Sequence, residues 1–88
     1  MDIEEKFEQA VHHSGKLTQK PGNDELLKLY ALYKQATEGD VTGERPGGFD
    51  FKGAAKYDVW LAMKGKGSTE CMEEYIIFVN DLHAKYNE

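Results

Sequence analysis

The sequence predicts an all-α fold, a small bundle of four helices. Apolar residues recur at intervals of three and four in four separate segments, which is the spacing of amphipathic helices. No segment keeps the alternation of apolar and polar residues that is typical of a β-strand. A chain of 88 residues buries roughly 60–65% of its surface on folding, enough for one modest core. We therefore expect residues 1–88 to form one domain.

The first predicted helix covers residues 2–13. Ile3, Phe7 and Val11 lie on one face, and acidic residues gather near the start, where the helix dipole favours them. Gly15 follows as a plausible stop.

The second predicted helix covers residues 24–38, with Asn23 as its N-terminal cap and Gly39 just past its end. Its apolar residues are too many for one stripe and form two lines. One line holds Leu26, Tyr30 and Tyr33, and the other holds Leu29, Leu32 and Ala36. A helix that is apolar on two faces lies between other helices or carries a ligand on its second face.

Residues 40–50 contain three glycines and one proline, which predicts a loop, and we expect Val41 and Phe49 to anchor it. A third helix is predicted over residues 51–63. A fourth begins near Ser68 and runs almost to the end of the chain. The unequal connections indicate a bundle in which the long loop crosses over.

Composition and charge exclude several classes of function. The net charge of -5 argues against a dedicated nucleic-acid binder. No segment has the length of a membrane span, and we expect no secretory or transit signal. The single cysteine, Cys71, excludes an internal disulfide and fits a reducing compartment; its place in an apolar stripe predicts a core residue.

Neither a catalytic nor a metal site is predicted. No arrangement combines an acid, a base and a nucleophile, so we expect no enzyme. His12 and His13 are adjacent and would point about 100° apart on a helix, which prevents them from sharing a metal ion. We expect surface histidines.

The informative cluster lies on the second helix. Tyr30 and Lys34 are one turn apart, and Tyr33 lies on an adjacent line. Such a surface offers an ammonium for a phosphate and rings for stacking on a planar base. Lys56 and Tyr75 would complete it from the sides. Packing of both helix-two tyrosines as core rings stays open as the alternative.

The sequence closely resembles the acyl-CoA-binding proteins, also called the diazepam-binding-inhibitor family. The resemblance covers nearly the whole chain. Its most specific part is the run from Leu29 to Asp40, Leu-Tyr-Ala-Leu-Tyr-Lys-Gln-Ala-Thr-Glu-Gly-Asp. Further matching positions are Phe7, Ala10, Pro21, Arg45-Pro46-Gly47, Lys56-Tyr57-Asp58-Val59-Trp60, Tyr75-Ile76, Val79, Leu82 and Lys85-Tyr86.

The resemblance implies a four-helix up-down-down-up bundle that binds long-chain acyl-CoA thioesters in the cytoplasm. It implies a monomeric, free-standing carrier and pool buffer, without a cofactor and without catalysis. Stable membrane insertion is not expected; transient contact with membranes or with acyl-CoA-using enzymes is compatible with this role.

The resemblance also assigns roles to single residues. Tyr30, Lys34 and Lys56 match positions that hold the 3′-phosphate of the CoA adenosine. Tyr33 matches the tyrosine that stacks on adenine, and Tyr75 matches a helix-four tyrosine that reaches the nucleotide.

Four further positions bear on the same site. Ala31 and Leu32 lie within the matching binding segment. Gly15 stands where many members have a basic residue, so we expect the adjacent Lys16 to offer a substitute contact.

Two other functions stay open. A helical interaction module would bind a protein through the exposed apolar face of the second helix. A signalling-peptide precursor is the other, and the absence of a signal peptide argues against conventional secretion.

Overall fold

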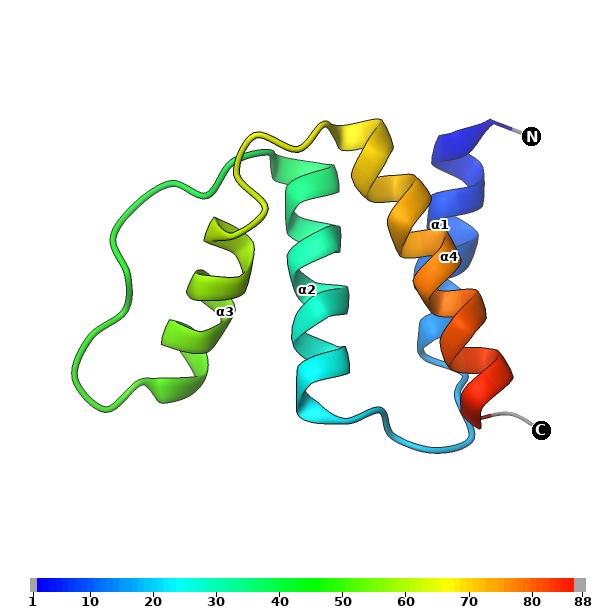
Figure 1. The fold of residues 1–88 in the computed structure, drawn as a ribbon, viewed down its shortest axis with the longest axis horizontal. Coiled ribbons are helices and arrows are strands. Elements are labelled where there is room, and N and C mark those ends of the chain that lie inside the picture. Colours follow the sequence, from blue (N-terminus) through cyan, green and yellow to red (C-terminus); the bar gives the residue numbers. More distant parts are fainter. Residues whose placement is uncertain (1, 87–88) are drawn as a thin grey trace.

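The computed structural model describes residues 2–86, which form four α-helices and, within that range, no β-strand. The helices are α1 (Ile3–Ser14), α2 (Asn23–Glu38), α3 (Phe51–Leu61) and α4 (Ser68–Tyr86). In Figure 1, α1 and α4 run in one direction and α2 and α3 in the other. The up-down-down-up arrangement is therefore confirmed. None of the described helices is long and apolar enough to cross a membrane.

The helices form a flat assembly of 40 × 28 × 15 Å with α2 at its centre. One side of α2 packs against α4, and the other side packs against α3. The first helix, α1, packs against α4. The third helix lies apart from α1 and α4 (Figure 1). Of the two alternatives for a helix that is apolar on two faces, the structure shows the first, because α2 lies between α4 and α3. The two sides of α2 face different surroundings.

The hydrophobic core lies between α1, α2 and α4. Of the two predicted lines on α2, the line of Leu29, Leu32 and Ala36 is buried there. Cys71 is fully buried, which confirms its predicted place in the core. The remaining buried members of this cluster are Phe7, Ala10, Tyr75, Val79 and Leu82.

Hydrogen bonds link the C-terminal end of α2 to α3 and to the two connections on either side of α3. Gly39 has φ 80°, a left-handed conformation in which glycine carries no steric cost. Its carbonyl oxygen accepts a hydrogen bond from Trp60 Nε1 at 2.8 Å. The buried Gln35 donates from Nε2 to Asp40 Oδ1 at 2.8 Å and to the Lys66 carbonyl at 3.2 Å. These bonds hold α3 in place beside α2.

Two helix ends differ from the prediction. Gly22, not Asn23, is the N-cap of α2, and the Glu25 side chain accepts a hydrogen bond from the Gly22 N–H at 2.9 Å. The Glu25 carboxylate therefore satisfies a backbone N–H at the start of α2, and the predicted Asn23 cap is not formed. The third helix ends at Leu61 because the chain then tightens into a turn, in which the Met63 N–H donates to the Trp60 carbonyl.

The anchoring of the loop before α3 was predicted incorrectly at Phe49. That side chain is 93% exposed, whereas Val41 is half-buried. Polar contacts to α3 hold the loop instead. Arg45 forms a two-pronged ion pair with Asp58, Nε to Oδ1 at 2.9 Å and Nη2 to Oδ2 at 3.0 Å, and the Tyr57 hydroxyl donates to the Gly43 carbonyl at 3.1 Å.

Candidate functional site

A groove of about 480 Å³ lies between α2 and α3. Its apolar lining comes from the first two turns of each helix, and three lysines and no acidic residue line it. We call it the α2–α3 groove. Its lining residues are Lys20, Asn23, Leu26, Leu27, Tyr30, Phe51, Lys52, Ala55 and Lys56.

Two ammonium groups lie near the Tyr30 ring, which lines this groove. Lys56 Nζ lies 5.2 Å from the centre of the ring, and Lys34 Nζ lies 6.0 Å from it. Lys34 Nζ also lies 5.1 Å from the centre of the Trp60 ring, which meets Tyr30 edge to face at 6.5 Å. The sequence-predicted trio of Tyr30, Lys34 and Lys56 is therefore brought together from two helices.

Lys34 also pairs with Glu38, one turn further along α2. The hydrogen bond from Lys34 to this carboxylate raises the pKa of the ammonium group, against the opposing effect of partial burial. Lys34 therefore keeps its charge at neutral pH, and its ammonium group is paired with the Glu38 carboxylate.

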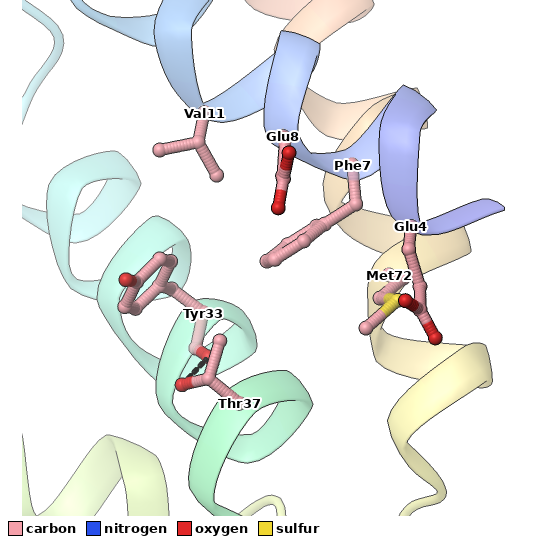
Figure 2. Close-up of a pocket in the computed structure, with 7 residues that line it drawn as sticks. All are labelled: Glu4, Phe7, Glu8, Val11, Tyr33, Thr37 and Met72. Carbon is pink, nitrogen blue, oxygen red and sulfur yellow. Dashed lines mark hydrogen bonds between the residues drawn. The ribbon is translucent and has the colours of Figure 1, made fainter.

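A second hollow, of about 280 Å³, opens on the other side of α2, towards α1 (Figure 2). The Phe7 and Tyr33 rings stack across it with centres 6.0 Å apart and an angle of 27° between planes. Tyr33 is 40% exposed, so part of its ring surface is open to a ligand. We call this the α1–α2 hollow; it is lined by Glu4, Phe7, Glu8, Val11, Tyr33, Thr37 and Met72.

Tyr30 and Tyr33 therefore face different openings, although the sequence placed them on one line. Tyr75 lines neither of the two. It is only 4% exposed, its ring meets Phe7 edge to face at 5.1 Å, and its hydroxyl lies 3.3 Å from Ser14 Oγ. Burial raises the pKa of this phenol. In this conformation Tyr75 supports Phe7 from behind and does not open towards a ligand.

Three other predicted site residues lie away from both openings. Ala31 and Leu32 are fully buried in the interior, where their side chains contribute to packing. Lys16 is exposed in the turn after α1 and lines neither the α2–α3 groove nor the α1–α2 hollow.

Sequence reasoning missed residues that only the packing of helices brings to the site. Trp60 lies one turn after Lys56 on α3, a spacing that could have indicated a shared face. Phe7 was predicted to belong to the core, and it does, yet its ring also lines the α1–α2 hollow. The only feature of the sequence that indicates a role for Glu38 is its position one turn after Lys34, which allows the two side chains to pair.

Among residues 2–86 no group of three His, Cys, Asp or Glu side chains is placed to hold a metal ion. The rings of His12 and His13 lie 6.5 Å apart, and those of His13 and His83 lie 6.0 Å apart, edge to face. His12 and His13 are exposed and His83 is half-buried.

Fold and site together define a class of small helical bundles with a cationic, aromatic-lined groove. Comparison with known families is specific: the family described as acyl CoA binding protein matches residues 4–79. The chain belongs to the acyl-CoA-binding protein family.

Relatives from three kingdoms have similar sequences. An acyl-CoA-binding protein homolog of Drosophila melanogaster is 46% identical over 96% of this chain and 98% of the relative. The acyl-CoA-binding protein of Brassica napus is 49% identical over 93% of this chain and 89% of the relative. The acyl-CoA-binding protein of Saccharomyces cerevisiae is 45% identical over 97% of this chain and 98% of the relative.

Solved structures agree with the fold. The crystal structure of acyl-CoA-binding protein 2 from Oryza sativa superposes with a TM-score of 0.90 at 40% identity, covering 96% of this chain and 93% of that one. The solution structure of the acyl-CoA-binding protein from yeast superposes with a TM-score of 0.73 at 46% identity, covering 93% of this chain and 95% of that one.

Proposed function

We propose that this protein binds acyl-CoA thioesters, long-chain ones in particular, and carries them without catalysing a reaction on them. The observation that carries the proposal is the α2–α3 groove, whose lining combines apolar side chains with three lysines and whose Tyr30 ring lies near a further ammonium group, that of Lys34. An acyl-CoA has the matching division into a long apolar chain and a highly charged nucleotide. Membership of the acyl-CoA-binding protein family supports the same ligand.

The surroundings of Tyr30 suit the 3′-phosphate of the CoA adenosine. Lys34 and Lys56 supply two point charges, and Tyr30 supplies a phenol between them. A phosphate that arrives here competes with Glu38 for Lys34. The exchange replaces one carboxylate by a group of higher charge, so the Lys34 ammonium loses no partner.

The apolar part of the groove suits the acyl chain. Its α2 lining extends from Asn23 to Tyr30, a length of roughly 10 Å at the helical rise. Leu26, Leu27 and Ala55 provide the apolar surface. Burial of the chain against them contributes roughly 25 cal/mol per Å² of apolar area. Free fatty acids would gain this contribution but not that of the nucleotide.

The α1–α2 hollow suits a neutral planar group better than a phosphate. Glu4 and Glu8 line it, and their charges repel an anion, whereas the open part of the Tyr33 ring offers a stacking surface. We assign adenine to Tyr33 on this basis, with Phe7 behind the ring and Tyr75 supporting Phe7.

Ala31 and Leu32 shape the same helix from inside the core, and Lys16 contributes a charge near the α1–α2 connection. The proposal treats residues 1–88 as one binding domain that acts as a monomer. It places the protein in the cytoplasm, where a lone buried thiol such as Cys71 stays reduced.

Calorimetric titration with acyl-CoA esters of several chain lengths tests the proposal, with CoA and the free fatty acids as comparison ligands. We expect the esters to bind far more tightly than either part alone, with affinity rising with chain length. Trp60 is the only tryptophan and contacts Lys34, so its fluorescence should change on binding. Equal affinity for an acyl-CoA and for the corresponding fatty acid would contradict the proposal.

A further inference from the structure

We propose that Phe49 and Phe51 contact the far end of a long acyl chain and thereby make affinity depend on chain length. We call these two residues the phenylalanine shelf. The inference rests on the proposed function, because the ligand is the same acyl-CoA. It adds a specificity-determining contact beyond the α2–α3 groove, since Phe49 does not line that groove.

The groove is shorter than a long acyl chain. Its lining on α2 extends from Asn23 to Tyr30, a length of roughly 10 Å. An extended alkyl chain advances about 1.3 Å per carbon, because its C–C bonds of about 1.5 Å follow a zigzag. The lining therefore covers roughly eight carbons. The second half of a hexadecanoyl chain extends beyond it.

A long chain leaves the groove at the starts of α2 and α3. The phosphate is assigned to the surroundings of Tyr30, so the apolar end of the ligand runs away from that residue. In Figure 1 the starts of both helices lie along the same edge of the molecule. Phe51 is the first residue of α3 and lines the groove. A chain that is longer than the groove therefore passes along Phe51.

Phe49 continues the apolar surface that Phe51 begins. The two rings meet edge to face with centres 6.4 Å apart, and they are the most exposed large apolar side chains of the described chain, at 93% and 74%. Hydrogen bonds hold the backbone between them. The Asp50 N–H donates to the Gly47 carbonyl, and the Asp50 carboxylate accepts from the Gly53 N–H at 2.9 Å as the cap of α3. The rings are therefore held side by side, open to an apolar group.

The shelf suits an alkyl chain better than a protein surface. Two phenylalanines at this exposure offer roughly 300 Å² of surface, whereas a stable interface needs about 800 Å² from each partner. A flexible alkyl chain needs no complementary shape, and the nucleotide already holds it at the groove. The part of the chain beyond the groove then exchanges contact with water for contact with two rings.

Calorimetry with octanoyl-CoA and hexadecanoyl-CoA tests the shelf, at concentrations below those at which the esters form micelles. The quantity measured is the ratio of the two affinities, because a general loss of binding or of stability lowers both affinities together. Phe49→Ser is the informative variant, and Phe49→Leu keeps an apolar side chain. Ile77→Ser is the matched control, since Ile77 is 60% exposed on α4 and lies outside the groove lining.

We expect hexadecanoyl-CoA to bind wild type far more tightly than octanoyl-CoA, and Ile77→Ser to keep the same ratio. Phe49→Ser should lower the ratio at least about fivefold, because the ring covers several methylenes and each methylene, when fully buried, contributes about fourfold. Phe49→Leu should retain most of the ratio. An unchanged ratio in folded Phe49→Ser would overturn the inference.

Amide chemical shifts in wild type locate the chain without a substitution. Hexadecanoyl-CoA should shift the amide resonances of residues 48–51 more than octanoyl-CoA does, whereas both esters should shift that of Lys34 alike. Identical shifts of residues 48–51 with the two esters would contradict the shelf. A dimer that forms only with hexadecanoyl-CoA and that Phe49→Ser abolishes would also contradict it, because a second copy would then cover the rings.

The same titrations separate this inference from the proposed function. If wild type binds hexadecanoyl-CoA and Phe49→Ser keeps the ratio, the proposed function stands and the shelf fails. If wild type binds neither ester, both fail.

Discussion

The Tyr86 hydroxyl donates a hydrogen bond of 2.5 Å to Glu25 Oε1, which joins the last residue of α4 to the first turn of α2. The same oxygen accepts from the Gly22 N–H, and Lys85 Nζ lies 3.0 Å from Oε2. Together these contacts lower the pKa of Glu25 from 4.5 to about 2, with the Tyr86 hydrogen bond as the largest cause. One carboxylate therefore caps α2 and fastens α4 to it.

The Glu25 contacts predict a dependence of stability on pH. Because the folded pKa lies below the unfolded value, the ionised carboxylate stabilises the fold above pH 4.5, and this contribution disappears as the pH falls towards about 2. Urea melts of wild type and Glu25→Gln should differ most at neutral pH and converge below pH 4.5. Glu73→Gln, at an exposed position of α4, is the control. A difference that is constant with pH would contradict the prediction.

Lys34→Ala should separate binding from folding. The ion pair with Glu38 is a surface pair and the ring contact is modest, so the free energy of unfolding should fall by less than about 1 kcal/mol. Acyl-CoA affinity should fall about tenfold or more, because the phosphate loses a charged donor. Lys28→Ala is matched to it, since Lys28 also lies on α2, outside the groove lining, with its Nζ 4.4 Å from the ring centre of Phe78 on α4. Unchanged affinity in folded Lys34→Ala would remove Lys34 from the site.

Glu38→Gln should strengthen acyl-CoA binding. The substitution removes the carboxylate that pairs with Lys34 and that would repel a phosphate at the same place. We expect affinity to rise severalfold at low salt, with a smaller gain at high salt because screening weakens the repulsion. Calorimetry at two ionic strengths measures the effect. Weaker binding by folded Glu38→Gln would show that the ligand uses the ion pair intact.

The 3′-phosphate assignment has a test in the ligand itself. Acyl esters of 3′-dephospho-CoA keep the chain, the thioester and the adenine but lose the group assigned to Tyr30, Lys34 and Lys56. Their affinity should be lower by tenfold or more, since each charged hydrogen bond contributes about 1.5–3 kcal/mol. In Lys34→Ala the two ligands should differ less. Equal affinity of both esters for wild type would refute the assignment.

The Cys71 thiol should react slowly in the folded protein. The side chain is fully buried, and burial raises the pKa of the thiol, so little thiolate forms at neutral pH. Alkylation by iodoacetamide at pH 8 should be far slower than in urea. Acyl-CoA should slow the reaction further if it stabilises the fold, because alkylation then follows unfolding. Rapid labelling of the native protein would contradict this placement.

The site was only partly accessible to prediction. Tyr30 and Lys34 were expected to share a face because they are one helical turn apart, and the structure confirms it. Local spacing does not show that α3 places Trp60 beside Lys34, which belongs to another helix. Nor does it show that the Tyr33 ring contacts Phe7 of α1 while Tyr30 faces α3. Phe49 was misjudged because an aromatic residue in a loop is expected to be buried.

The sequence by itself determined the four helices and the two apolar lines of α2, since both follow from the periodicity of apolar residues along a helix. Its long run from Leu29 to Asp40 also indicated the family. Only the structure decided that the line of Leu29, Leu32 and Ala36 enters the core. Only the tertiary structure decided that Tyr75 is buried, that Tyr30 and Tyr33 face separate openings, and that Glu25 holds α4. These outcomes depend on how helices pack, and packing brings together residues such as Glu25 and Tyr86, which are 61 positions apart and whose proximity no local pattern encodes.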